Sequence, residues 1–173
     1  VVNLIYAINY TFAKDVMPKF IQPSGFILLR VTGAVIFFSL IYFLFVKEKV
    51  KKKDIARLAI CGVFGVAINQ LFFFEGLNLT TPINAAIIMT VNPVLVIIMS
   101  VLILFEKINI RKGIGIVFGL VGASALILSG GNVSGDATYM KGNMFVFVNA
   151  TSYGLYLVLV KPLMQKYNPF TVM

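Results

Sequence analysis

Long apolar runs, separated by short polar segments, are the feature that most limits what this chain can fold into. Six runs stand out, at about residues 1–17, 24–46, 55–77, 82–105, 114–129 and 143–160. A transmembrane helix needs about 20 mostly apolar residues, whereas a transmembrane strand needs about 9–11 residues of alternating polarity. Because the runs are long and continuous, we expect an all-α integral membrane protein with about six transmembrane helices.

The overall composition excludes several other classes of protein. Of the 173 residues, 60% are hydrophobic and 12% are charged, whereas soluble domains average roughly 45–50% and about 25%. The net charge of +9 lies in segments that flank the apolar runs, so we expect a lipid bilayer as partner and no nucleic acid. The chain has no histidine and one cysteine, Cys61. We therefore expect no metal, no cofactor and no enzyme activity.

The positive residues also predict an orientation. Loops after the second, fourth and sixth runs carry eleven Lys or Arg residues, and the opposite loops carry three. Cytoplasmic loops are enriched in Lys and Arg. We therefore expect a multi-pass protein of the cell (inner or plasma) membrane with its N-terminus in the cytoplasm.

The first and last apolar runs resemble each other at an offset of 147 residues. Tyr6 corresponds to Tyr153, Lys14 to Lys161, and Met17 to Met164. Because five helices lie between the two starts, the second copy enters the membrane from the opposite side. This pattern is typical of the inverted repeats of many secondary transporters.

Polar residues on the first two helices are candidates for a substrate cavity. Asn3, Tyr10 and Lys14 fall within about 40° of one another on a helix, although Lys14 could also reach the headgroups. Arg30, inside the second run, could bind a substrate carboxylate. It could equally form a structural pair with Asp15 or Glu75, or reach the headgroups.

Glu75 is the one carboxylate inside an apolar run. Charged residues within a membrane are costly and usually line a pathway or contact a partner. Glu75 could therefore contact a substrate amine or couple transport to protons. Its place near the end of the third helix leaves open the alternative that it only reaches the headgroups.

The later helices supply the remaining candidates. Pro93 lies near the middle of the fourth run, where it frees the carbonyl of Met89, and this favours Asn92 and Pro93 as substrate-lining residues. An ordinary kink that improves packing is the alternative. Further cavity candidates are Asn69, Asn84, Tyr153 and Tyr156.

Four patterns occur in a fixed order along the chain. They are the opening helix through Lys14, Pro23 and Arg30; the stretch 69–93; Glu106 before a basic loop and a glycine-rich helix; and the restart 141–161. Together they resemble the EamA-type branch of the drug/metabolite transporter superfamily over essentially the whole chain. The resemblance implies ten helices in two inverted five-helix repeats around a central cavity, with Glu106 structural and Pro93 the central proline.

The resemblance also implies domain boundaries and a function. Residues 1–135 match a first five-helix repeat and residues 141–173 the truncated start of a second, so we expect a piece of a longer protein. We expect a permease or exporter of small polar metabolites, such as amino acids, that works by alternating access. The alternative is a small multidrug-type transporter or a non-transporting membrane assembly subunit, and the oligomeric state is left open.

Overall fold

The computed structural model describes residues 2–17, 19–46, 48–106, 109–129 and 137–173. The described residues form helices and contain no strand, which confirms the expected all-α membrane fold. The helices are α1 (Val2–Val16), α2 (Pro23–Ile41), η1 (Tyr42–Val46), α3 (Lys52–Gly62), η2 (Val63–Ile68), α4 (Asn69–Leu79), α5 (Pro82–Met89), α6 (Asn92–Leu104), α7 (Ile110–Ser129), α8 (Ala137–Met164) and α9 (Pro169–Val172).

Several of these elements join into longer helices. Within the described residues, four continuous stretches are long and apolar enough to cross a membrane: Pro23–Val46, Lys52–Leu79, Pro82–Leu104 and Thr138–Met164. They correspond to the second, third, fourth and sixth apolar runs. Helices α1 and α7 correspond to the first and fifth runs, and some of their side chains lie outside the described residues.

Proline marks where several helices begin. Pro23, Pro82 and Pro169 stand in the first turn of α2, α5 and α9, where the missing N–H costs no intrahelical hydrogen bond. Thr81 caps α5, because its hydroxyl accepts a hydrogen bond from the Asn84 N–H at 3.2 Å. These local signals place the helix ends close to where the sequence predicts them.

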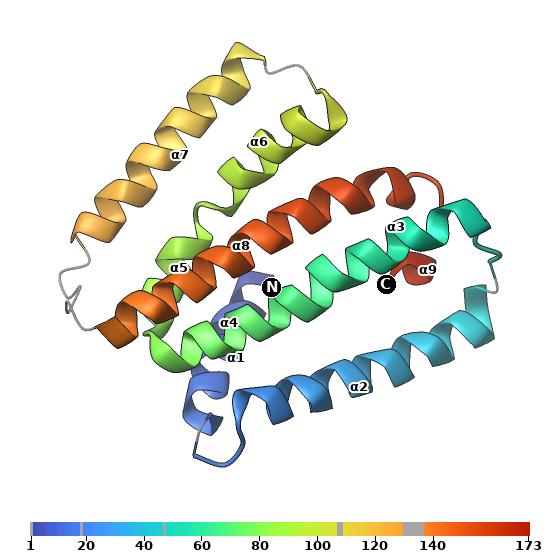
Figure 1. Cartoon of the computed structure of the whole chain (residues 1–173), viewed down its shortest axis with the longest axis horizontal. Helices are drawn as coiled ribbons and strands as arrows, with labels where there is room; N and C mark the ends of the chain where they lie inside the picture. Colours follow the sequence, from blue (N-terminus) through green and yellow to red (C-terminus); the bar gives the residue numbers. More distant parts are fainter. Residues whose placement is uncertain (1, 18, 47, 107–108, 130–136) are drawn as a thin grey trace.

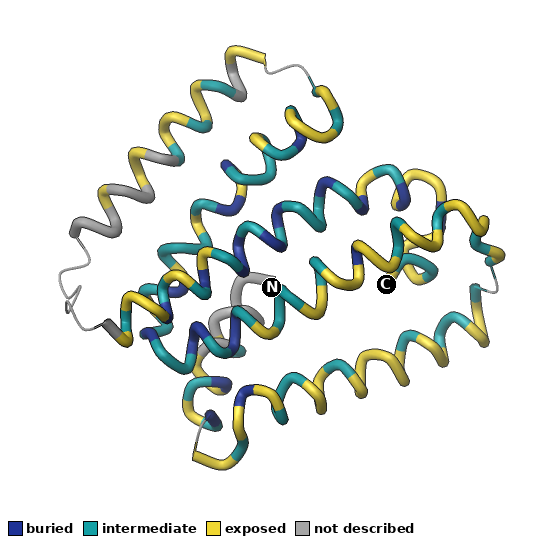
Figure 2. The backbone as a smooth tube through the Cα atoms, viewed as in Figure 1, coloured by how far each residue is buried: buried dark blue, intermediate teal, exposed yellow. Residues whose placement is uncertain are grey.

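Helix α8 lies in the middle of the arrangement (Figure 1). It packs along α4 and η2 on one side and along α5 and α6 on the other. Helix α7 lies beyond α6, and α2 lies on the opposite outer side. Burial follows this order, since α8 and α4 carry many of the buried residues and α2 is largely exposed (Figure 2).

The bundle has two chemically different ends, which we name for what they carry. The glycine end carries Gly76 and Gly142, and the lysine-rich end carries the loop 48–51 and the chain after α8. Lys161 and Lys166, after the sixth run, form ion pairs with Glu106, after the fourth run, and Asp54, after the second run. The segments that follow the second, fourth and sixth runs therefore lie at one end of the bundle. Each end has its own buried apolar cluster, of which one includes Phe74 and the other Cys61.

At the glycine end, α4 and α8 cross at very close range. A Cβ atom built on Gly76 would lie 2.9 Å from the carbonyl oxygen of Gly142, and one on Gly142 would lie 2.9 Å from the backbone nitrogen of Thr80. Side chains essentially never approach backbone so closely, so both positions require glycine. This contact, which we call the glycine crossing, fixes α8 against the end of α4.

The fourth run is broken in its middle, as Pro93 predicts. The N–H groups of Thr90 and Val91 donate to the carbonyls of Ile87 and Ile88, three residues back, at 3.0 and 3.1 Å. This tight turn separates α5 from α6. Because proline has no N–H, Pro93 cannot donate to the Met89 carbonyl.

Candidate functional site

Three side chains bind backbone carbonyls of neighbouring helices in the middle of the bundle. Asn92 Nδ2 donates to the Ala150 carbonyl at 3.0 Å, Asn149 Nδ2 to that of Asn69 at 2.8 Å, and Ser152 Oγ to that of Phe64 at 2.6 Å. All three side chains belong to buried residues. We call Asn92, Asn149 and Ser152 the central polar layer.

Helix irregularities explain why this layer forms where it does. Phe64 lies in the π-helical turn η2, Asn69 directly follows it, and Asn92 follows the break in the fourth run. Departures from α-helical geometry rearrange backbone hydrogen bonds, and π-turns are frequent at functional sites. Within a membrane, such backbone is tolerated where it is buried in protein or lines a cavity.

Asn149 differs from the other two members of the layer. It is 1% exposed, and its Oδ1 atom has no hydrogen-bond partner among the described groups. A buried acceptor without a donor costs about 1–3 kcal/mol. The amide cannot simply turn around, because its Nδ2 already donates to the Asn69 carbonyl. The oxygen is therefore able to accept a hydrogen bond from a further donor.

Two tyrosines extend this region along α8. The rings of Tyr153 and Tyr156 lie 6.0 Å apart between centroids, tilted by 30°. The Tyr156 ring packs so closely on Gly65 in η2 that a Cβ atom there would lie 2.5 Å from it. Five sequence-predicted candidates therefore lie in or beside this region: Asn69 through its carbonyl, Asn92 with the following Pro93, Tyr153 and Tyr156.

Lys14 lies at the glycine end and makes backbone contacts there. Its Nζ donates to the carbonyls of Leu77, Asn78 and Thr80 at 2.8, 2.7 and 2.9 Å. These carbonyls belong to the C-terminal end of α4, which attracts a positive charge. The structure therefore gives Lys14 a capping role in addition to any contact with a solute.

Asn84 and Arg30 also lie toward the glycine end. Asn84 lies in the first turn of α5, and its neighbour Thr80 donates from its hydroxyl to Asn143 Oδ1 at 2.6 Å. Arg30 donates to Asn9 Oδ1 at 2.6 Å, and its guanidinium lies 5.0 Å from the centroid of the Phe74 ring. The contacts of Arg30 therefore join α2 to α1 and α4.

Glu75 is half-buried on α4 and takes part in none of the described ion pairs. It lies apart from the central polar layer, closer to the glycine end. The side chains of Asn3 and Tyr10 lie outside the described residues, so their place in the site stays a prediction. Pro93 is exposed and contributes through the backbone break rather than through a buried contact.

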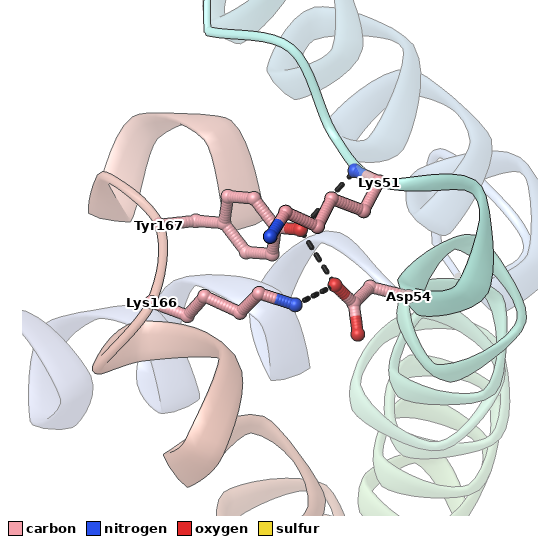
Figure 3. A network of polar contacts seen from close by, with 4 residues as sticks. All are labelled: Lys51, Asp54, Lys166 and Tyr167. Atoms are coloured by element: carbon pink, nitrogen blue, oxygen red, sulfur yellow. Dashed lines mark hydrogen bonds and ion pairs between the residues drawn. The ribbon is translucent and has the colours of Figure 1, made fainter.

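A second polar cluster joins the lysine-rich loop to the chain after α8 (Figure 3). Lys166 forms an ion pair with Asp54, and the Tyr167 hydroxyl donates to the same carboxylate at 2.6 Å. The Lys51 N–H donates to the Tyr167 oxygen at 3.1 Å. The hydrogen bond to Asp54 raises the pKa of the Lys166 ammonium above its ordinary value.

Glu48 ties the same two segments together a second time. Its Oε2 accepts hydrogen bonds from the Asn168 N–H at 2.9 Å and from the Thr171 hydroxyl at 2.8 Å. We call the whole cluster the end network; its members are Glu48, Lys51, Asp54, Lys166, Tyr167, Asn168 and Thr171. No sequence pattern predicts these contacts, because the partners lie more than 100 residues apart along the chain.

Comparison with known proteins places the chain in a family. Residues 1–128 match the model of the EamA-like transporter family. The chain belongs to the EamA-like transporter family. It is 28% identical over 155 residues to an uncharacterized transporter of Archaeoglobus fulgidus, covering 89% of this chain and 53% of that protein. No solved structure matches the chain significantly.

Other relatives of this EamA-like chain carry similar names. An uncharacterized transporter of Bacillus subtilis is 27% identical, covering 94% of this chain and 54% of its own. A WAT1-related protein of Arabidopsis thaliana is 26% identical, covering 96% and 52%. The chain thus spans about half the length of the curated relatives it matches. Family and helices together confirm a membrane protein of a transporter family.

Proposed function

We propose that this chain is part of a secondary transporter that moves small polar metabolites, such as amino acids, across the cell membrane by alternating access. The observation that supports it most is the central polar layer, in which buried Asn149 keeps an acceptor oxygen without a donor. A solute with an N–H or O–H group could supply that donor. The layer lies in helices that are broken or π-turned, as in many transporter substrate sites.

The proposal includes the repeat boundaries expected from the sequence. Residues 1–135 form the first five-helix repeat and residues 141–173 begin the second. The close packing of α8 between α4 and α6 supports this division, because it brings the start of the second repeat against the first. The family match over residues 1–128 lies within the first repeat.

The orientation is part of the same proposal. The lysine-rich end faces the cytoplasm, as does the N-terminus, and the glycine end faces outward. Exposed Lys49, Lys51, Lys52 and Lys53 at one end support this, since cytoplasmic loops attract such residues. Glu75 would then lie toward the outside, where a half-buried carboxylate can take up a proton and couple its movement to transport.

A flux measurement with the full-length protein in proteoliposomes tests the proposal. The probes are radiolabelled amino acids, supplied one at a time over a range of concentrations. A carrier gives a rate that saturates with concentration for at least one probe and excludes others. A rate that rises linearly, or equals that of empty liposomes for every probe, would contradict this substrate class and favour an assembly subunit.

A further inference from the structure

The long helix Lys52–Leu79, which joins α3, η2 and α4, is held against α8 differently at its two ends. At the glycine end, backbone contacts backbone around Gly76 and Gly142, and buried Thr80 donates to Asn143. At the lysine-rich end, side chains of the end network reach from the loop 48–51 and α3 to the chain after α8, next to the buried apolar cluster that includes Cys61.

Packing between these helices weakens toward the lysine-rich end. Helix α8 packs closely along α4 and η2 and much less along α3, although α3 and α4 have the same length. The π-turn η2 separates the closely packed part from the loosely packed part. Arg57 supplies one direct tie there, since its Nε donates to the Leu159 carbonyl at 3.1 Å.

The ion pair of the end network is weak and partly accessible to water. The side chains of Lys166 and Asp54 are 34% and 16% exposed. Exposed ion pairs contribute about 0–1 kcal/mol each, because water and salt compete for both charges. Bonds of this strength can break and reform readily, unlike the backbone contacts at the glycine crossing.

An apolar layer lies directly beneath the network. It consists of Cys61, Val160, Leu163 and Tyr167, and Cys61 is 3% exposed. Cys61 lies seven residues after Asp54 on the same helix, so it is on the same face and about 10 Å deeper. Tyr167 belongs to both the network and the layer, so movement of this residue would uncover the thiol.

We propose that the end network is a latch, which closes the lysine-rich end while α3 and α8 pivot at the glycine crossing and at η2. When the network breaks, α3 separates from the end of α8 and exposes Cys61. The inference rests on the proposed function, because a carrier must open each end in turn. Its test measures thiol reactivity and not flux, so the latch and the proposed function can fail separately.

The experiment uses Cys61, the single cysteine of these residues, as the reporter. The full-length protein, with any further cysteine replaced, is placed in nanodiscs, and the rate of Cys61 modification by N-ethylmaleimide is measured. Asp54→Asn and Lys166→Gln each remove the ion pair. We expect each to raise the rate by about fivefold, which corresponds to the upper range for an exposed pair.

Two kinds of control separate the latch from general loosening. Lys53→Gln removes an exposed positive charge beside Asp54, and Lys141→Gln removes one at the glycine end; neither should change the rate. Exchange of the two charges, Asp54→Lys with Lys166→Asp, should bring the rate below that of either single variant. Part of the increase should remain, because a lysine at position 54 cannot accept the hydrogen bond from the Tyr167 hydroxyl. A loss of folding cannot produce this rescue, and melting temperatures of all variants identify any that unfold.

The outcomes decide the proposal. Fast modification in both single variants, with slower modification in the exchanged pair and wild-type rates in the controls, supports the latch. Wild-type rates in Asp54→Asn and Lys166→Gln would overturn it. An equal increase in Lys53→Gln or Lys141→Gln, or no rescue in a folded exchanged pair, would also overturn it, because the effect would then not come from the paired charges.

Discussion

Lys14 was predicted to line a substrate cavity, but in the structure it binds the end of a neighbouring helix. Its ammonium lies among three backbone carbonyls at the end of α4. An ammonium satisfies carbonyls that the helix end leaves without intrahelical donors. The same contacts connect α1 to the glycine crossing, so Lys14 helps to fix the end about which we propose the helices pivot.

Replacement of Lys14 by methionine should therefore lower stability. Methionine keeps the length of the side chain but cannot donate to the carbonyls of Leu77, Asn78 and Thr80. We expect the melting temperature in detergent to fall by about 5 °C, since hydrogen bonds from charged groups contribute about 1.5–3 kcal/mol. Lys19→Met, at an exposed position nearby, is the control. Equal melting temperatures for both variants would show that Lys14 does not cap α4.

Glu75 gives a prediction about pH. If its carboxylate carries the coupled proton, Glu75→Gln removes the group that titrates, and the transport rate should no longer depend on pH. Arg30→Gln serves as a comparison, because it removes a charge on α2 that binds Asn9; the transport that remains should still depend on pH. Transport by Glu75→Gln that keeps the wild-type pH profile would assign Glu75 a structural role.

At the scale of elements, the apolar runs predicted the helices well. The starts at Pro23 and Pro82 and the break before Pro93 follow from local chemistry, because proline fixes the backbone angle and removes one donor. The π-turn η2 could not be predicted, since it goes together with the hydrogen bond from distant Ser152 to Phe64. The side chain of Asn69 was predicted to line a cavity, whereas in the structure its backbone carbonyl accepts a hydrogen bond from Asn149.

The candidate site was predictable to a similar extent. Side-chain chemistry singled out Asn92 and the tyrosines of α8, which the structure brings to the middle of the bundle. The unpaired acceptor of Asn149 could not be predicted, because it depends on which donors of the neighbouring helices come within hydrogen-bonding distance of its oxygen. The ion pair of Asp54 with Lys166 could not be foreseen for the same reason.

The glycine crossing predicts opposite effects for two glycine-to-alanine substitutions. Gly142→Ala places a Cβ atom 2.9 Å from backbone atoms of Leu79 and Thr80, and we expect it to destabilise the protein by about 1–3 kcal/mol. Gly33→Ala meets nothing within 4 Å and should stabilise α2 by about 0.5–1 kcal/mol. Melting temperatures in detergent check both. A neutral Gly142→Ala would contradict the close approach of α4 and α8.

At the scale of the whole molecule, burial and charge are distributed in a way that suits a moving part. Helix α8 contacts helices on both sides (Figure 1), and each of its ends is fastened by different chemistry. Close backbone contacts hold the glycine end, and side-chain bonds beside a buried apolar cluster hold the lysine-rich end. The central polar layer lies between them, where a movement of α8 would change the surroundings of Asn149.

We propose that the central polar layer binds the transported solute, and Asn149→Leu removes the unpaired oxygen on which this proposal rests. Leucine has a similar volume and removes the unpaired acceptor, but it also takes the side-chain donor from the Asn69 carbonyl. Because these two effects oppose each other, the free energy of unfolding should change by about 1 kcal/mol or less. Thr151→Val is the control, because the Thr151 hydroxyl bonds within α8 to the Phe147 carbonyl.

The measurement is the initial rate of solute uptake into proteoliposomes, with melting temperatures recorded for the same samples. We expect Asn149→Leu to lower the rate by about tenfold, because the solute loses one hydrogen bond of about 1.4 kcal/mol. Thr151→Val should keep the wild-type rate. Wild-type uptake by a stable Asn149→Leu protein would contradict the claim that solute binds at the central polar layer.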